Sequence, residues 1–258
     1  MVYTKTMKLS AALLIFFLAL TPAAADSFSN NLNWSARANI FYFAADNGKQ
    51  DADPAPILPS MGFSAEWRFW GPLRLEFSED IYFTNYEYNS TLEYAMPCNP
   101  ENRSAFVMGF VTGFQLAGFF PIGKTGIVAR VYGGPAADLR LVVQAFGLSP
   151  NDYNSGDIKT DASLQTEAIR KYFWSDGRWF FPMSGLGMDF PINEKFLLGF
   201  DLRAWFPVYR LWTDKDLPAI DGWRFGVGIR LTPRKKPAPP KEIVPDEDSE
   251  EQDTGTGE

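Results

Sequence analysis

Residues 223–231 read Trp-Arg-Phe-Gly-Val-Gly-Ile-Arg-Leu, and this segment decides the fold class. Every odd position holds a large apolar residue, and every even position holds arginine or glycine. Successive side chains of a β-strand point to opposite faces, so this period of two predicts a strand with one apolar face and one polar face.

The same alternation recurs along most of the chain. Within residues 127–143 it is interrupted by Gly133-Gly134-Pro135, which predicts a bulge or a bend. Together these patterns predict eight strands, at residues 34–44, 61–69, 73–83, 105–119, 127–143, 179–190, 196–206 and 223–231.

Short and long connections between these segments alternate. Tight turns rich in Gly, Pro and Asn follow the even-numbered strands, whereas longer stretches follow the odd-numbered ones, at residues 46–60, 85–104, 145–177 and 208–221. An antiparallel sheet with all its tight turns at one end is typical of outer-membrane barrels. We therefore expect an all-β protein, an eight-stranded antiparallel up-and-down transmembrane β-barrel.

Two features of the long connections are distinct. Residues 162–173 predict a short helix, either lying over the barrel mouth or contacting a partner, or packing only its own apolar residues. Its apolar side is expected to hold Leu164, Ala168, Ile169, Tyr172 and Phe173. Cys98, the one cysteine of the chain, is expected to be a solvent-facing loop residue.

The alternation alone does not say which medium touches the apolar face. In a soluble sheet the apolar face points inward, whereas in a membrane barrel it meets lipid and the polar face fills the lumen. Three features favour lipid: the bulk of the apolar face, the glycines on the polar face, and the use of arginine rather than lysine there, since arginine suits buried ion pairs. An ordinary solvated face remains the alternative.

On the membrane interpretation, charged residues of the polar face form an ion-pair network in the lumen. Its expected members are Arg37, Glu66, Arg68, Arg74, Glu76, Asp80, Arg130, Asp138, Arg140, Asp189, Asp201, Arg203, Arg224 and Arg230. Aromatic residues near the strand ends are expected to form interface girdles, namely Trp70, Phe119, Phe120, Trp179, Phe180, Phe181, Phe206, Trp212 and Trp223.

Both ends of the chain differ from the middle. Residues 1–25 carry Lys5 and Lys8, an apolar core of twelve residues and a final Ala-Ala-Ala, which predicts a secretory signal peptide cleaved after Ala25. Residues 26–233 are then the barrel. Residues 234–258 are Pro-rich and then acidic, and we expect a disordered periplasmic tail, either a docking segment or a solvated terminus.

Composition excludes several kinds of chemistry. The 258 residues carry a net charge of −7, which disfavours nucleic acid as a partner. There is no histidine, so Ser-His-Asp and Cys-His catalysis and His-ligated metals are excluded. Glu79 with Asp80, and Asp138 near Arg140, could be read as acid–base groups, but ion pairing explains them more simply. We expect no catalytic residue, no cofactor and no metal site.

The signal, the alternating strands and the rhythm of connections together resemble the small eight-stranded outer-membrane barrels of Gram-negative bacteria, such as the OmpA transmembrane domain and the OmpX and OmpW families. The resemblance covers about residues 34–233. Residues 223–231 are similar to the C-terminal signal read by barrel-assembly machinery, although they end in Leu231 and not in the usual Phe or Trp, and further residues follow. The lipid A enzymes with this architecture rely on a histidine that this chain lacks.

These observations predict a non-enzymatic protein of the cell outer membrane. Its expected role is a structural or interaction platform, or a narrow, porin-like conduit for small molecules, hydrophobic ones included, with external loops that contact a ligand or a host. One alternative is a soluble periplasmic β-barrel that binds a lipidic ligand. The other is a lipid-modifying outer-membrane enzyme.

Overall fold

A computed structural model describes residues 31–44, 57–91, 93–145, 155–213 and 222–234. The expected signal peptide and nearly all of the expected tail lie outside these residues. The described strands are β1 (Leu32–Phe43), β2 (Ile57–Trp70), β3 (Leu73–Asn89), β4 (Tyr94–Cys98), β5 (Ala105–Ile122), β6 (Ile127–Gly134), β7 (Ala136–Gln144), β8 (Met183–Pro191), β9 (Phe196–Trp205) and β10 (Arg224–Pro233).

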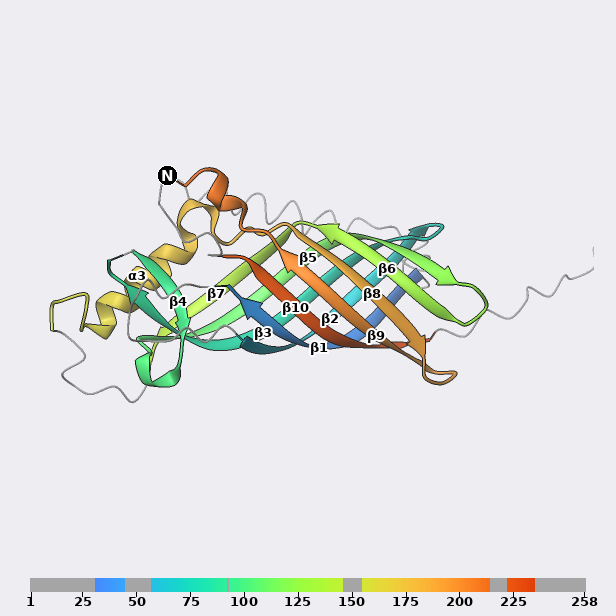
Figure 1. Cartoon of the computed structure of the whole chain (residues 1–258), viewed down its shortest axis with the longest axis horizontal. Helices are drawn as coiled ribbons and strands as arrows, with labels where there is room; N and C mark the ends of the chain where they lie inside the picture. Colours follow the sequence, from blue (N-terminus) through green and yellow to red (C-terminus); the bar gives the residue numbers. More distant parts are fainter. Residues whose placement is uncertain (1–30, 45–56, 92, 146–154, 214–221, 235–258) are drawn as a thin grey trace, which may run out of the picture.

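The strands form one antiparallel sheet that closes on itself (Figure 1). Closure occurs at β1, where Ala38 pairs with Met61 of β2 on one side and with Ile229 of β10 on the other. Both β6 and β7 pair with β5, so they are two halves of one barrel strand, while β4 pairs only with the outer end of β3. The barrel therefore has eight strands, and the predicted fold class is confirmed.

The break between β6 and β7 falls at the predicted interruption. Pro135 has no N–H to give to the ladder, but its carbonyl oxygen still accepts a hydrogen bond from the Phe114 N–H at 3.0 Å. Gly134 is required here by close approach, since a Cβ atom at this position would lie 2.1 Å from the Phe114 carbonyl oxygen. The bulge bends the strand without opening the barrel wall.

Two long connections are partly strand, which corrects the sequence prediction. β2 begins at Ile57, and β3 continues to Asn89, where it pairs with β4 inside the stretch expected to be a loop. Residues 82–88 contain Tyr, Phe and Thr, which favour extended backbone, so the β3–β4 hairpin extends the wall beyond its neighbours. Cys98 lies on β4 and is buried, contrary to the expectation of a solvent-facing residue.

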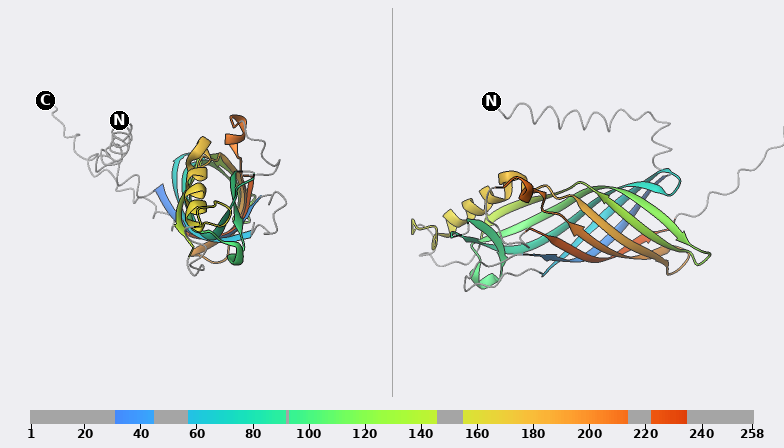
Figure 2. Two further views of the ribbon diagram at one scale, coloured as in Figure 1. Left: turned by 90° about the vertical axis from the view of Figure 1, so that its left-hand side faces the viewer. Right: turned by 45° about the horizontal axis from the view of Figure 1, so that its top comes forward.

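The predicted helix is present as α3 (Ala162–Trp174), which lies across the end of the barrel that carries β4 (Figure 2). It begins after Asp161, whose side chain accepts hydrogen bonds from the Ser163 and Leu164 N–H groups. Its packed face differs from the prediction: Leu164 is exposed, and the buried residues are Ala162, Thr166, Ile169 and Phe173. These face β3, β4, β5 and β7.

Short 3-10 helices occupy residues Pro100–Asn102 (η1), Ser175–Gly177 (η3) and Val208–Leu211 (η4), all at the same end as α3. The opposite end has short turns, as between β2 and β3 at Gly71 and Pro72. Among the described residues, no helix has the length and apolar character needed to cross a membrane.

The two faces of the wall have opposite polarity. On β10 the outward residues are about half exposed, with Phe225 at 45% and Val227 at 60%, whereas the inward Arg230 is 1% exposed. The same holds on β1, where Trp34 and Ile40 point outward and Arg37 is buried. The barrel therefore places apolar side chains outside and charged ones inside.

Candidate functional site

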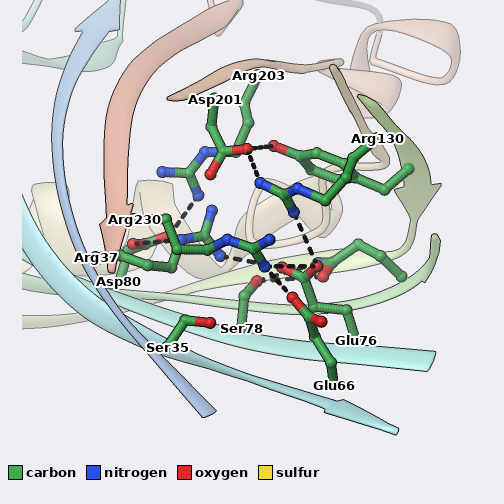
Figure 3. A network of polar contacts seen from close by, with 12 residues as sticks. Ser35, Arg37, Glu66, Glu76, Ser78, Asp80, Arg130, Asp201, Arg203 and Arg230 are labelled. Atoms are coloured by element: carbon green, nitrogen blue, oxygen red, sulfur yellow. Dashed lines mark hydrogen bonds and ion pairs between the residues drawn. The ribbon is translucent and has the colours of Figure 1, made fainter. Parts of the chain in front are cut away.

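The interior holds a dense cluster of ion pairs near the end of the barrel with short turns (Figure 3). Arg130 on β6 lies at its centre, with no exposed side-chain surface. Its guanidinium contacts Glu76 at 3.5 Å, Asp189 at 3.2 Å and Asp201 at hydrogen-bond distance. One arginine thus links its own strand, β6, to β3, β8 and β9.

Arg230 on β10 makes a second set of contacts in the same cluster. It forms an ion pair with Glu66 of β2 and contacts Asp189 at 2.7 Å, and the other oxygen of Glu66 accepts a hydrogen bond from Arg74 at 2.7 Å. Because Glu66 and Arg230 lie on either side of β1, this pair spans a whole strand of the wall.

Asp80 on β3 holds the third part of the cluster. It accepts hydrogen bonds from Arg203 at 2.5 Å and from the Asn39 amide at 2.7 Å. Arg37 lies 4.0 Å from Asp80 and 3.4 Å from Glu76, so it joins the two carboxylates. We call the ten residues of these paragraphs the lower cluster: Arg37, Glu66, Arg74, Glu76, Asp80, Arg130, Asp189, Asp201, Arg203 and Arg230.

A second and smaller group lies toward α3. Asp138 on β7 accepts hydrogen bonds from Arg140, from Arg224 on β10 and from the Tyr82 hydroxyl on β3. We call Asp138, Arg140 and Arg224 the upper cluster. Arg224 lies between the rings of Phe43, at 4.3 Å, and Phe181, at 3.9 Å, which fixes its guanidinium by cation–π contact.

Aromatic side chains fill the interior between the two clusters. Phe41 and Trp205 meet edge to face with ring centroids 5.2 Å apart, and Tyr82 lies next to Phe41 at 6.4 Å. Gly226 makes room for this layer, because a Cβ atom there would lie 3.0 Å from the Trp205 ring and 3.2 Å from Phe41. Large residues on one side of the lumen thus face a glycine on another.

The structure brings together thirteen of the fourteen residues expected in the lumen, in two clusters and not in one network. Arg68 is the exception: it is exposed and lies beside a bulge at the end of β2. Its even position predicts an inward side chain, but the wall ends at the adjacent turn, so the lumen does not enclose it. Phe119 and Phe181, expected in the interface girdles, are also interior residues.

Several interior residues escaped the sequence analysis because they are not charged. Asn39 and Tyr82 complete the hydrogen bonds of Asp80 and Asp138, and Ser35 bonds the Thr232 hydroxyl at 2.7 Å. All of them share the inward parity of the charged residues on their strands, and that parity is the signal that could have found them.

Glu79 is a charged residue on the outer, apolar face of the barrel. It precedes the inward Asp80 and therefore faces outward, among Phe63 and Phe77 and next to Thr112, whose hydroxyl donates a hydrogen bond to it at 2.7 Å. It lies near the middle of β3 and not at an end. A carboxylate thus sits within the apolar outer face.

The burial of the lower cluster restricts what the interior can do. The side chains of Arg130, Arg230, Glu66 and Asp80 are each 0–1% exposed. A water-filled passage at this level would leave its lining accessible, so the lumen is filled here by protein. Within the described parts of the chain, no group of three or more Cys, Asp and Glu has the arrangement of a metal site.

Comparison with known proteins gives fold likeness only. No protein-family model matches the chain, and no curated protein matches it. Among solved structures, the N-terminal β-barrel domain of Pseudomonas aeruginosa OprF matches with TM-score 0.37 and 13% identity over 78% of this chain and 97% of that one. Neisserial surface protein A matches with TM-score 0.39 and 13% identity over 80% and 97%.

The outer membrane protein OprG from Pseudomonas aeruginosa matches with TM-score 0.44 and 10% identity, over 78% of this chain and 94% of that one. At these identities the likeness concerns the path of the backbone. For the fold alone, the closed eight-stranded barrel of this chain agrees with the predicted resemblance to small eight-stranded outer-membrane barrels.

Proposed function

We propose that this chain is an integral outer-membrane β-barrel whose lumen is a structural plug and whose capped mouth is an interaction platform. The observation that carries the proposal is the reversed polarity of the wall, with apolar side chains outside and salt-bridged ones inside. That arrangement suits a barrel surrounded by hydrocarbon.

The apolar area on the outside of the barrel is large enough to indicate a lipid environment. Soluble monomers rarely expose a contiguous apolar patch of more than a few hundred Å², whereas here exposed apolar residues occur on every strand of the barrel. They include Trp34, Ile40, Met61, Phe63, Leu75, Phe83, Phe114, Leu116, Val131, Leu139, Leu141, Leu186, Phe200, Leu202, Phe225, Val227 and Ile229.

The length of the wall agrees with the thickness of a membrane. A strand of about ten residues rises about 33 Å, and a tilt of about 40° reduces this to about 25 Å, the height of the lipid-facing band in such barrels. β9 and β10 have ten residues each and cross the barrel obliquely (Figure 1).

The filled interior favours a platform over a conduit. The lower cluster and the aromatic layer lie one above the other, so a solute would have to displace both. A soluble barrel that binds a lipid is disfavoured for the same reason, because its interior would be apolar and hollow. The lipid-modifying enzyme has no observation in its favour.

The partners follow from this arrangement as proposals. The outer face contacts outer-membrane lipid. Residues 223–231, which lie at the start of and along β10, the strand that closes the barrel against β1, engage the barrel-assembly machinery. The long connections contact an external ligand or host. Export requires the signal peptide, with cleavage after Ala25, and nucleic acid is not a partner.

Spin labelling tests which medium surrounds the wall. In a Cys98→Ala background, single cysteines at Leu75 and Phe225 on the outer face and at Ser78 on the inner face would carry the label in lipid vesicles. We expect the outer labels to relax with dissolved oxygen and the Ser78 label with neither oxygen nor an aqueous reagent. Outer labels that relax with the aqueous reagent would contradict a lipid-facing wall.

Planar-bilayer conductance distinguishes platform from conduit. We expect no steady current from the wild type, while Arg230→Ala opens a leak by removing a side chain that fills the lumen. A steady current through the wild type would contradict a structural plug and would support the conduit function.

A further inference from the structure

A cavity of about 40 Å³ lies at the capped end of the barrel, beneath α3. Its walls come from elements far apart in the chain: Phe43 of β1, Pro97 of β4, Tyr172 of α3, Tyr209 of η4 and Trp223 next to β10. A water molecule needs about 10–15 Å³ measured in this way, so the cavity has room for a few waters or for one small anionic group. Figure 2 shows α3 across this end.

Three arginines line the cavity: Arg140, Arg178 and Arg224. Arg140 and Arg224 share the single carboxylate of Asp138, and among the described residues Arg178 forms an ion pair with Asp176, whose side chain is 43% exposed. Within the described part of the chain, three cations therefore face one buried and one half-exposed carboxylate. The described lining of the cavity carries an excess of positive charge.

Arg178 presents an unused edge to its surroundings. Its side chain is 2% exposed and its Nη1 atom donates to Asp176 at 3.3 Å, but Nε and Nη2 have no hydrogen-bond partner among the described residues. These two atoms form one side of the guanidinium, the fork that binds two oxygens of a carboxylate or a phosphate.

The fork is held in place before any ligand arrives. The guanidinium of Arg178 lies 4.3 Å from the ring centroid of Tyr172 and 4.8 Å from that of Tyr209. Buried donors without partners cost free energy, and an oxyanion in the cavity would recover it.

We propose that this cavity binds an oxyanion, a phosphate or carboxylate group, on the Nε–Nη2 edge of Arg178. The inference deepens the proposed function and rests on it in one respect, that the α3 end faces the external solution. The cavity admits only the anionic group, so the rest of a larger ligand lies outside. The group belongs either to a soluble molecule or to a phosphate-bearing lipid.

The direct test follows the side-chain Nε–H signal of Arg178 by NMR, with the full chain folded in lipid-free detergent micelles. Sodium phosphate and sodium acetate are the probes, and sodium chloride at equal ionic strength is the control. We expect phosphate or acetate to shift the Arg178 signal saturably and chloride to leave it in place. No shift with either probe, or an equal shift with chloride, would overturn the proposal.

Two variants distinguish binding by the Arg178 fork from a general effect of positive charge. Arg178→Gln should weaken phosphate binding about tenfold or more, followed through the backbone amides of Gly177 and Trp223. Lys171→Gln, which removes the same charge from an exposed position on α3, should change affinity less than about twofold. Equal affinity in Arg178→Gln and the wild type would refute the assignment.

Arg178→Lys guards against a folding defect, because it keeps the charge and loses only the fork. If Arg178→Gln fails to show heat-modifiable gel mobility, the lysine variant decides: weaker phosphate binding supports the proposal, and unchanged binding overturns it. Heat-modifiable mobility and membrane insertion of the wild type test the proposed function separately from this site.

The two sources of the oxyanion are distinguished in nanodiscs without added phosphate. A shifted Arg178 signal in phosphomonoester-bearing lipid, but not in neutral glycolipid, identifies a lipid as the source. A signal that shifts only when soluble phosphate or acetate is added identifies a soluble ligand.

Discussion

Arg230 and Glu66 are 164 residues apart in the chain, yet they form a buried ion pair that passes over β1 inside the barrel. The pair ties the last strand to the second and so reinforces the closure at β1. Asp189 shares Arg230 at 2.7 Å, which links the same closure to β8. The lower cluster therefore stabilises the closed barrel by ion pairs between strands inside the lumen.

Arg230→Ala should destabilise the barrel strongly. It leaves Glu66 and Asp189 buried with reduced compensation, and breaking a buried pair in this way costs about 3–5 kcal/mol. Urea unfolding in vesicles, followed by tryptophan fluorescence, measures the loss. Arg68→Ala, at an exposed position, should change stability by less than about 0.5 kcal/mol, and a similar loss in both variants would contradict the role of the cluster.

Gly134→Ala should destabilise the barrel by about 1–3 kcal/mol, because the new Cβ atom would collide with the Phe114 carbonyl oxygen. Gly133→Ala is a matched control one residue away, where the nearest atom is the Met183 carbonyl oxygen at 3.2 Å. Unfolding midpoints of the two variants should differ clearly. Equal midpoints would show that the bulge relaxes around either side chain.

Glu79→Gln should stabilise the protein in lipid by up to about 2 kcal/mol, since it removes a charge from the lipid-facing band while the Thr112 hydroxyl can still donate to the amide oxygen. Thr112→Val tests the other side of the contact and should destabilise the barrel. If Glu79→Gln lowers stability, the carboxylate has a partner other than lipid.

Glu87 should make the β3–β4 hairpin, beyond the membrane-spanning wall, sensitive to pH. Burial raises the pKa of this carboxyl from 4.5 to about 7. An acid that binds its proton more tightly when folded stabilises the fold at low pH, and this contribution declines as pH rises from about 4.5 to about 7. Amide exchange of β4, corrected for intrinsic rates, should therefore speed up across that range.

Glu87→Gln is the control for this pH effect, because the amide does not titrate. Its β4 amides should exchange at a corrected rate that is flat over the same range. A wild type that is equally flat would show that Glu87 stays ionised in the folded hairpin.

Alternation along a strand identifies some of the interior residues and misses others. Parity along β1, β3 and β10 identifies Arg37, Asp80 and Arg230 as inward residues, because a strand alternates its side chains wherever it lies. Arg68 has the same parity and fails, since a bulge and the end of the wall intervene. Arg178 lies outside any strand, so no periodicity marks it as buried.

Alternation and the spacing of turns were enough to predict eight barrel strands, their antiparallel order and the presence of one apolar and one polar face on each, because each of these depends on neighbours along the chain. Tertiary structure alone decided that Arg230 meets Glu66, that two clusters form with aromatic rings between them, and that Arg178 lines a cavity under α3. Those contacts depend on the register of strands that meet only when the sheet closes, and on a helix that packs where distant segments converge.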